Sequence, residues 1–341
     1  MKCVVCGDPG VKGKLIYETM KELENDGVSF TILDWKGDLT IDAFYSEILR
    51  IERSGAEGVE PFQELIEVIS DADFLIVHFA PVSEKVISAS KKLKMIGCIR
   101  GGYENVNVEA AKKKGITVLN APGRTTGAVA DFTMGLILCL TRKIPEFCTS
   151  LKQGVWKTVD RANMPQNLEG KTLGLVGFGN IGRAVAIRAK GFGMNMLAYD
   201  PYVKEVSPDL NTRLVDLETL LRESDIVSVH ARLTPATKHM IGMAQFRLMK
   251  KTAYFVNTAR SGLVDEKALL DALEQKLIAG AAIDVFDEEP LSKDSRFMKL
   301  DNVIITPHMA GSTIDTFLNG PRMMVKEIRR LLRGEKTSFS L

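Results

Sequence analysis

Between Lys171 and Gly182 the chain reads KTLGLVGFGNIG. Its first half is a short apolar run typical of a buried strand, and its second half spaces three glycines as G-x-G-x-x-G before an amphipathic helical pattern. Gly177 permits a tight turn, Gly179 lets the backbone approach a pyrophosphate, and Gly182 allows the helix to pack closely on the strand. The helix N-terminus adds N–H donors and a positive dipole, so this segment predicts a dinucleotide-phosphate site.

An acidic residue follows at the position that distinguishes two dinucleotides. Asp200 lies 18 residues after Gly182, at the end of the predicted strand 195–199. A carboxylate there accepts hydrogen bonds from both ribose hydroxyls of NAD and repels the extra phosphate of NADP. A Rossmann-like turn that binds nothing is the alternative, but the strand, loop, helix and acid together favour NAD as the cofactor. A second pair, Gly191 and Gly193, has no strand before it and predicts only a helix-ending turn.

Apolar runs alternate with charged, helically spaced stretches along nearly the whole chain, which predicts an α/β protein with two parallel sheets. The strands of the first sheet are predicted at residues 3–6, 29–33, 74–77, 95–99 and 117–119. Those of the second sheet are predicted at 172–176, 195–199, 225–229, 253–257, 281–285 and 303–306. Helices are predicted, among others, at 14–25, 108–114, 126–142 and 312–333.

Two features predict where the two sheets separate along the chain. Residues 120–123 (NAPG) form a turn cluster that opens a long apolar helix. The last helix has no strand after it, so we expect it to pack back on the first unit. The prediction is a discontinuous domain of residues 1–119 and 312–341, with residues 120–311 inserted as the NAD-binding domain. The length of 341 residues agrees with two domains of about 150 residues each.

Composition excludes several classes of protein. Lys and Arg number 45 and Asp and Glu 43, so a net charge of +2 gives no electrostatic footprint for nucleic acid or an anionic membrane. The N-terminal apolar run is too short for a signal sequence, and no apolar stretch reaches the roughly 20 residues of a membrane span, so we expect a cytoplasmic protein. Cys3 and Cys6 form a C-x-x-C with no second ligand pair, which predicts buried strand cysteines rather than a metal site.

Three residues that follow predicted strands of the second sheet are candidates for a reaction centre. Arg260 follows the strand 253–257, Glu289 follows the next strand and His308 follows the last one. Because the carboxyl ends of parallel strands meet at one edge of the sheet, we expect these side chains at the same edge as the glycine loop. Singly, each has an ordinary explanation, as a loop ion pair, a solvated acid and a strand cap. Beside a dinucleotide site they together predict a catalytic group.

The chemistry that these three residues favour is hydride transfer between nicotinamide and a small 2-hydroxy or 2-keto acid. Arg260 offers the planar, bidentate cation that suits a substrate carboxylate. Histidine gives and takes protons near neutral pH, so His308 is the candidate acid and base for the substrate oxygen. Glu289, bonded to the other imidazole nitrogen, favours the charged ring and holds its orientation.

The remaining histidines are weaker candidates. We expect His78 near the ligand cleft, His230 in a packing or cofactor-wall position, and His239 facing solvent. None of the three is expected to have a carboxylate in a comparable position.

Several segments occur in the order and spacing of a known family: residues 105–111 (NVNVEAA), 177–182, 257–265, 280–290 and 306–313. With them the chain resembles the D-isomer-specific 2-hydroxyacid dehydrogenases over about residues 70–335, and most of all the phosphoglycerate dehydrogenase type without a C-terminal regulatory domain. The resemblance implies a flavodoxin-like substrate domain and an inserted NAD-binding Rossmann domain. It also implies an active cleft that closes by hinge motion and a homodimer built through the cofactor domain.

The resemblance assigns roles by position. Arg260 matches the arginine that binds the substrate carboxylate, His308 the acid and base, and Glu289 its partner. The positions that match cofactor contacts are Gly177, Gly179, Asn180, Ile181, Gly182, Asp200, Ala231, Arg232, Thr258, Asp284, His308 and Gly311. Substrate-domain loops that face the ligand are matched by Gly101 and Gly102 and by residues 79–82.

The chain departs from the family at several positions. Arg100 stands where the family has a small residue, Glu104 replaces an aspartate, and Arg232 stands where proline is common. Arg124 and Asp131 are also unusual. Our hypothesis is that Arg100, with Arg124, binds a second acidic group on a phosphorylated or dicarboxylic substrate. The alternative is that both arginines face solvent or pair with carboxylates such as Glu104.

The leading hypothesis is therefore an NAD-dependent oxidoreductase for a D-2-hydroxy acid and its 2-keto partner. The alternative is an NAD(H)-sensing binding protein of the corepressor type, which also resembles this family, although the chain lacks the charge bias expected of a scaffold. Related formate enzymes have glutamine beside the histidine, and Glu289 argues against them. Residues 37–62 resemble the family least, and are either a specificity insertion or a helical cover.

Overall fold

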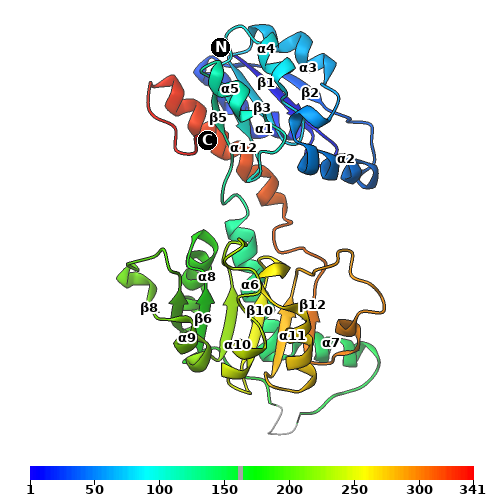
Figure 1. Ribbon diagram of the computed structural model, residues 1–341, viewed down its shortest axis with the longest axis vertical. Coiled ribbons are helices and arrows are strands. Elements are labelled where there is room, and N and C mark those ends of the chain that lie inside the picture. Colours follow the sequence, from blue (N-terminus) through cyan, green and yellow to red (C-terminus); the bar gives the residue numbers. More distant parts are fainter. Residues whose placement is uncertain (160–163) are drawn as a thin grey trace. The chain divides into compact units, whose positions relative to one another are not determined.

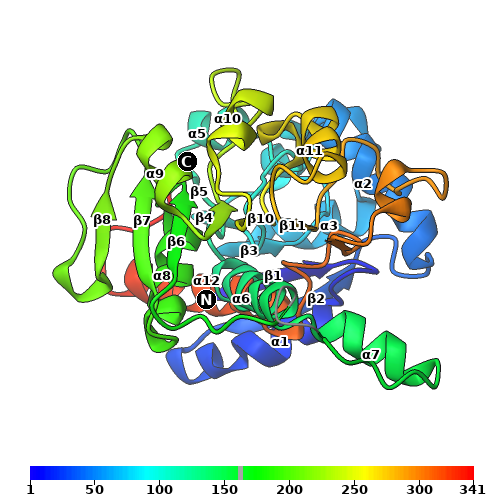
Figure 2. The ribbon, with the colours of Figure 1, turned by 90° about the horizontal axis from the view of Figure 1, so that it is seen from below.

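The computed structural model describes residues 1–159 and 164–341. The chain forms two compact units (Figure 1). Unit 1 consists of Met1–Arg124 and Thr313–Leu341, and unit 2 consists of Thr125–Ser312. Each unit has one parallel sheet with helices on both faces (Figures 1 and 2).

Unit 1 has a five-stranded sheet in the order β2-β1-β3-β4-β5. Its strands are β1 (Lys2–Gly7), β2 (Ser29–Asp34), β3 (Phe74–Val77), β4 (Met95–Cys98) and β5 (Thr117–Leu119). All pairs of strands are parallel. All five strands were predicted from apolar runs, and the runs of β3 and β4 are apolar because both strands are buried at every residue. The predicted flavodoxin-like order is confirmed, and its reversal point lies between β1 and β3.

Helices cover both faces of this sheet. On one face lie α1 (Gly13–Met20) and α12 (Ile314–Leu332). On the other lie α2 (Ile41–Ser54), α3 (Gln63–Val68), α4 (Glu84–Ala89) and α5 (Val108–Lys113). The final helix packs on unit 1 as predicted, because its Met324, Val325 and Ile328 join the apolar layer that α1 covers.

Two open points of the N-terminal region are resolved by this packing. Cys3 and Cys6 are buried in β1 as predicted, and they lie in different apolar layers because residues three apart on a strand point to opposite faces. Burial raises the pKa of both thiols. Residues 37–62 contain α2, which packs on the sheet through Phe44 and Ile51. This segment therefore includes a helix that covers the sheet.

Unit 2 has a seven-stranded parallel sheet in the order β12-β11-β10-β9-β6-β7-β8. Its strands are β6 (Thr172–Val176), β7 (Asn195–Tyr199), β8 (Thr212–Leu214), β9 (Ile226–Val229), β10 (Tyr254–Asn257), β11 (Gly280–Ile283) and β12 (Val303–Ile305). Counted within the unit, this is the Rossmann order 3-2-1-4-5-6 with a seventh strand added. The sequence prediction missed β8, because it is a three-residue edge strand with no buried residue.

The helices of unit 2 also form two layers (Figure 2). One layer contains α6 (Thr126–Arg142) and α8 (Asn180–Gly191); the other contains α9 (Leu217–Glu223), α10 (Met243–Leu248) and α11 (Glu266–Glu274). After α6 follows α7 (Ile144–Lys152), which has no buried residue. The long apolar helix and the helix-ending glycines are confirmed by α6 and α8. Within the described ranges, no helix combines the length and hydropathy that a membrane span requires.

Candidate active site

The glycine loop joins β6 to α8 beside the reversal point of the sheet in unit 2, which lies between β6 and β9. Gly177 has a φ of +95°, and a Cβ there would lie 2.5 Å from the backbone nitrogen of Ala231. A Cβ on Gly182 would lie 2.3 Å from the carbonyl oxygen of Gly177. A Cβ on Gly179 would point into open space. The loop is therefore tightly packed at two glycines and open at the third.

The surroundings of this loop fit NAD. No side chain caps the N-terminus of α8 at Asn180, so the N–H groups of its first turn are available to a pyrophosphate. Asp200 follows β7, and its carboxylate accepts hydrogen bonds from the N–H groups of Phe178 and Tyr202, both at 2.9 Å. The acid predicted to bind ribose thus lies directly against the glycine loop.

The other predicted cofactor contacts follow the ends of β9 to β12. Ala231 packs against the glycine loop, whereas Arg232 is exposed. Thr258 is buried, and its hydroxyl lies 2.9 Å from the hydroxyl of Thr133 on α6. Gly311 lies close to the start of α6. These positions share one edge of the sheet, and their contacts with NAD stay predictions.

His308 and Glu289 form an ion pair on the loops after β12 and β11. The distance from His308 Nδ1 to Glu289 Oε2 is 2.8 Å, and the side chains are 48% and 36% exposed. The other carboxylate oxygen accepts the N–H of Phe286 at 3.0 Å. His308 has a φ of +54°, which is uncommon for a residue with a side chain and indicates a position held by its surroundings. Its Nε2 makes no hydrogen bond within the described part of the chain.

The backbone around His308 is held by Asp284, which is fully buried at the end of β11. Asp284 Oδ1 accepts hydrogen bonds from the hydroxyl of Thr306 (2.6 Å) and the N–H of Met309 (2.8 Å), and Oδ2 accepts the N–H of Ala310 (2.8 Å). These charge-assisted bonds position the loop on both sides of His308.

Arg260 lies in a turn after β10 that Asn257 shapes. The Asn257 side chain accepts the N–H of Ala259 at 3.0 Å and donates to the carbonyl of Arg260 at 3.1 Å. The Arg260 guanidinium is exposed and lies near Glu289. Burial raises the pKa of Glu289, but hydrogen bonds from His308 and Phe286 and the positive charges of His308 and Arg260 outweigh it and leave the pKa below its ordinary value. The structure thus brings the three candidate catalytic residues together, and their roles stay predictions.

In unit 1, Arg100 follows β4 and is only 6% exposed. Its guanidinium stacks on the ring of Phe79 at 3.3 Å, and its Nη2 lies 3.2 Å from Glu104. Its Nη1 is buried and has no hydrogen-bond partner among the described residues. The solvent-facing alternative is therefore wrong for Arg100, and the pairing with Glu104 leaves one side of the guanidinium unused.

The residues next to Arg100 shape this edge of unit 1. The carbonyl of Gly101 accepts a hydrogen bond from Asn120 at 2.7 Å, and that of Gly102 lies 3.3 Å from the thiol of Cys98. Arg124 is partly buried and donates from Nη1 to the carbonyl of Thr316 at 3.3 Å. Burial and the nearby charge of Arg100 lower the pKa of Arg124, so the two guanidinium groups lie near each other.

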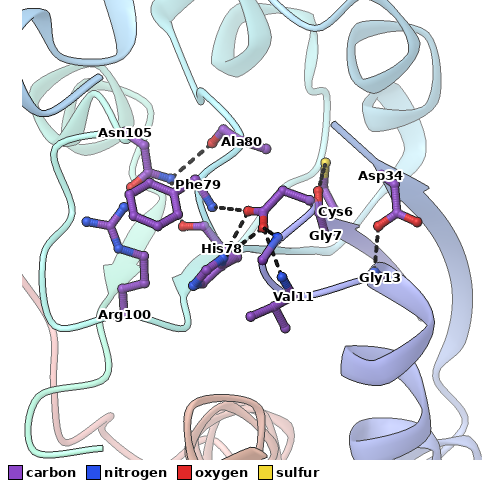
Figure 3. Close-up of polar contacts among 12 residues, drawn as sticks. Cys6, Gly7, Val11, Gly13, Asp34, His78, Phe79, Ala80, Arg100 and Asn105 are labelled. Carbon is purple, nitrogen blue, oxygen red and sulfur yellow. Dashed lines mark hydrogen bonds and ion pairs between the residues drawn. The ribbon is translucent and has the colours of Figure 1, made fainter. Parts of the chain in front are cut away.

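A second histidine–carboxylate pair lies in unit 1, and the expectation that His78 has no carboxylate partner was wrong (Figure 3). His78 Nδ1 lies 2.9 Å from Asp8 Oδ2. Asp8 follows β1 and His78 follows β3, which are neighbours only because the strand order reverses there. The available signal was an acid and a histidine that each directly follow a buried apolar run.

The remaining two histidines have no carboxylate within hydrogen-bond distance in the described ranges. His230 follows β9; its Nε2 lies 3.0 Å from the hydroxyl of Ser228, and its Nδ1 is buried without a partner among the residues described. Burial lowers the pKa of His230 to about 4. His239 is exposed, as predicted.

Comparisons with known proteins agree with this architecture. The family model "D-isomer specific 2-hydroxyacid dehydrogenase, NAD binding domain" matches residues 134–310. The chain is 47% identical over 277 residues to D-3-phosphoglycerate dehydrogenase of Methanocaldococcus jannaschii, and 42% identical over 275 residues to glyoxylate reductase of Korarchaeum cryptofilum. It is 44% identical over 255 residues to hydroxypyruvate reductase of Thermotoga maritima.

These alignments cover 80%, 80% and 74% of this chain. They cover 52% of the phosphoglycerate dehydrogenase, 83% of the glyoxylate reductase and 82% of the hydroxypyruvate reductase. The chain therefore spans about half the length of the first relative and most of the length of the other two.

Solved structures show the same fold. D-lactate dehydrogenase with NAD+ from Lactobacillus jensenii is 26% identical, with a TM-score of 0.77 over 100% of this chain and 99% of that one. An NAD-complexed D-isomer specific 2-hydroxyacid dehydrogenase from Lactobacillus delbrueckii ssp. bulgaricus is 24% identical, with a TM-score of 0.79 over the full length of both chains. The chain belongs to the D-isomer specific 2-hydroxyacid dehydrogenases, a family of NAD-dependent oxidoreductases that act on a CH–OH group.

Proposed function

We propose that this chain transfers a hydride between NAD and a D-2-hydroxy acid/2-keto acid pair that carries a second acidic group. The observation that carries the proposal is the cluster of Arg260, Glu289 and His308 at the sheet edge that also holds the glycine loop. A binding protein of the corepressor type can keep the same three side chains, so turnover rather than the motif distinguishes the two functions.

The residues of the cluster divide the chemistry between them. NAD, when bound, accepts or supplies the hydride. Arg260 binds the substrate carboxylate through its forked N–H donors and so orients the neighbouring carbon. His308 Nε2 takes the hydroxyl proton during oxidation and returns it to the carbonyl oxygen during reduction. Glu289 holds Nδ1 and stabilises the charged ring in between.

The second acidic group is inferred from unit 1. The unused Nη1 of Arg100 is a desolvated cationic donor, and an anionic ligand oxygen would compensate it. The relatives are named for phosphoglycerate, glyoxylate and hydroxypyruvate. These compounds share a carboxylate and differ in the group at the other end of the molecule. Arg100 is the feature of this chain that favours the acidic member of this series.

A panel of 2-keto acids tests the reaction and the substrate class together. NADH oxidation is followed with glyoxylate, hydroxypyruvate, phosphorylated hydroxypyruvate and a dicarboxylic keto acid, with the His308→Ala variant as the control. We expect the highest kcat/KM on an acidic member and its loss in the variant. NADH binding without turnover on any member would contradict the proposed substrate class and favour the NAD(H)-sensing binding protein.

Replacing Arg100 tests the second acidic group directly. We expect Arg100→Ala to lower kcat/KM for the best acidic substrate by about 10- to 100-fold and to leave glyoxylate turnover nearly unchanged. Arg50→Ala, on the exposed surface of α2, is the matched control. An unchanged kcat/KM on the acidic substrate would contradict this part of the proposal.

We also infer a homodimer, because the family resemblance implies one. Light scattering on the purified chain tests it, and a monomer mass at assay concentration would contradict it.

A further inference from the structure

A groove in unit 1 is lined by cations that the hydride-transfer residues of unit 2 do not explain. It lies where α12 meets the 3₁₀ helix Lys21–Asp26, on the face of the sheet that α1 and α12 cover (Figure 2). Its volume of about 490 Å³ falls within the range of about 300–1,000 Å³ that is typical of small-ligand sites. Every lining residue belongs to unit 1, so the groove is complete within that unit.

The charge that lines the groove is strongly positive. Its charged side chains are four cations and one acid, namely Arg124, Arg322, Lys326, Arg329 and Glu22. Arg329 is neutralised, because its Nη1 lies 3.4 Å from Glu22 and its Nε lies 2.9 Å from Asp26. The other three cations make no ion pair with any residue in the described ranges. Three uncompensated charges thus meet in one groove of a chain whose net charge is only +2.

Three of the four cations form a stripe along α12. Arg322 and Lys326 are four residues apart, and Arg329 follows three residues later, so their side chains lie on one face of the helix. Like charges at this spacing repel each other and destabilise a helix. A solvated helix face ordinarily carries charges of alternating sign, whereas here the neighbouring lining positions of α12 are the uncharged Asn319 and Met323. A bound anion would relieve this repulsion.

Asn319 holds two of the cationic residues beside each other. Its side-chain oxygen accepts a hydrogen bond from Arg322 Nη1 at 3.4 Å, and its side-chain nitrogen donates to the backbone carbonyl of Arg124 at 3.2 Å. Arg124 in turn donates from Nη1 to the carbonyl of Thr316 at 3.3 Å. The Arg124 guanidinium is partly buried, and this burial lowers its pKa. A partly desolvated cation without a counter-charge is stabilised when an anion binds beside it.

We propose that this groove binds a small anion with two or more linked phosphate groups, a ligand other than the hydroxy-acid substrate. Arg124 and Arg322 offer planar forks of N–H donors that match phosphate oxygens, and Lys326 adds a compact third charge. A single carboxylate would leave two of the three cations uncompensated, whereas linked phosphates supply several negative charges along one groove. Inorganic pyrophosphate and the phosphate chain of a nucleotide share this chemistry.

Isothermal titration calorimetry of the full chain tests the groove with inorganic pyrophosphate as the probe. NADH is present at saturation, so that the dinucleotide site is occupied. We expect saturable binding to the wild type, and a Kd at least about tenfold higher for the double variant Arg322→Ala/Lys326→Ala. Both residues are exposed, so their replacement leaves the core of unit 1 intact. No binding of pyrophosphate to the wild type would overturn the proposal.

A matched double variant controls for net charge. Lys112→Ala/Lys113→Ala removes the same charge from exposed positions on α5, which covers the other face of the sheet. We expect its Kd for pyrophosphate to stay within about twofold of the wild type, because exposed charges far from the groove are screened. Equal weakening in the two double variants would show attraction to net charge alone and would overturn the site.

Arg100→Ala distinguishes the groove from the substrate cation of the proposed function. The guanidinium groups of Arg100 and Arg124 lie near each other, so an anion held by Arg100 could be mistaken for one in the groove. We expect Arg100→Ala to keep the Kd for pyrophosphate within about threefold of the wild type. A loss as large as that of Arg322→Ala/Lys326→Ala would place the anion at Arg100 and overturn the groove.

Titrations with orthophosphate, tripolyphosphate and ATP decide which form of the ligand the groove takes. We expect orthophosphate to bind most weakly, because it reaches fewer of the cations. Tighter binding of ATP than of tripolyphosphate would identify a nucleotide, and equal binding would identify the phosphate chain alone. Orthophosphate binding as tight as pyrophosphate would overturn the requirement for linked phosphates. None of these measurements needs turnover, so they stand or fall independently of the proposed function.

Discussion

The two units each carry a histidine–carboxylate pair at the carboxyl edge of a parallel sheet, and the pairs differ in their surroundings rather than in their geometry. The distance from Nδ1 to the carboxylate is 2.9 Å for His78 and Asp8, and 2.8 Å for His308 and Glu289. The first pair has side chains that are 6% and 0% exposed, whereas those of the second are 48% and 36% exposed.

This comparison shows that a short hydrogen bond between histidine and a carboxylate does not define a function. Around His78, burial and two guanidinium groups favour the neutral ring, which suits a binding site. His308, Glu289 and Arg260 all have exposed side chains, which suits groups that react with a substrate. Burial and neighbouring charge, rather than distance, separate the two pairs.

The largest expected difference between the pairs is in catalysis. We expect His308→Ala to lower kcat/KM by about 10³- to 10⁴-fold on every substrate, because the substrate oxygen loses its proton donor and acceptor. NADH binding, measured by fluorescence titration, is expected to persist, because the glycine loop and Asp200 are unchanged. A variant within tenfold of wild-type activity would contradict the assignment of the exposed pair to the reaction.

For stability we expect the opposite order, with a larger effect from the buried pair than from the exposed pair. Asp8→Asn leaves backbone N–H donors and an imidazole N–H without a buried anionic acceptor, so we expect the free energy of unfolding to fall by about 3–5 kcal/mol. Glu289→Gln, in the exposed pair, is expected to change it by less than about 1 kcal/mol. Urea unfolding of both variants without cofactor measures this, and equal effects would remove the distinction between the pairs.

His230, which has no carboxylate partner among the described residues, extends the comparison to the pH dependence of stability. Its folded pKa of about 4 lies below the ordinary 6.5, so the unfolded chain binds a proton that the folded chain does not. The free energy of unfolding therefore falls as the pH drops from about 6.5 to about 4, by on the order of 3 kcal/mol from this residue. Unfolding of the wild type and His230→Asn across this range checks it. Identical pH dependence of the two would show that His230 is not the cause.

Asp200, a carboxylate with no histidine partner in the described ranges, provides the smallest effect. It accepts two backbone N–H groups, one of them from Phe178 in the glycine loop. We expect Asp200→Ala to lower the preference for NADH over NADPH by about tenfold, because the repulsion of the NADP phosphate is removed. The ratio of kcat/KM for the two cofactors measures this. An unchanged ratio would mean that Asp200 only supports the loop.

The strands, the glycine loop and NAD as the cofactor could be predicted because their signals are local. The glycine loop lies between one apolar run and one helical pattern, and Asp200 follows the next apolar run. This strand, loop, helix and acid could therefore be predicted from residues that are close in the sequence. Glu289 and His308, 19 residues apart, each follow one of two consecutive strands that are neighbours in the sheet. Only β8 was missed among the strands, because its three residues at the sheet edge bury no side chain and leave no periodic signal.

The resemblance implied the strand order of unit 1, but only the tertiary structure showed that Asp8 pairs with His78 and what surrounds Arg100. Asp8 and His78 are 70 residues apart, and they meet because β3 adds beside β1 on the side opposite β2. Periodicity shows that each strand is buried but contains nothing about which strands become neighbours. The same holds for Arg100, whose sequence position indicates a loop after a strand. Its stacking on Phe79, and the lack of a partner for Nη1 among the described residues, depend on how two loops pack together.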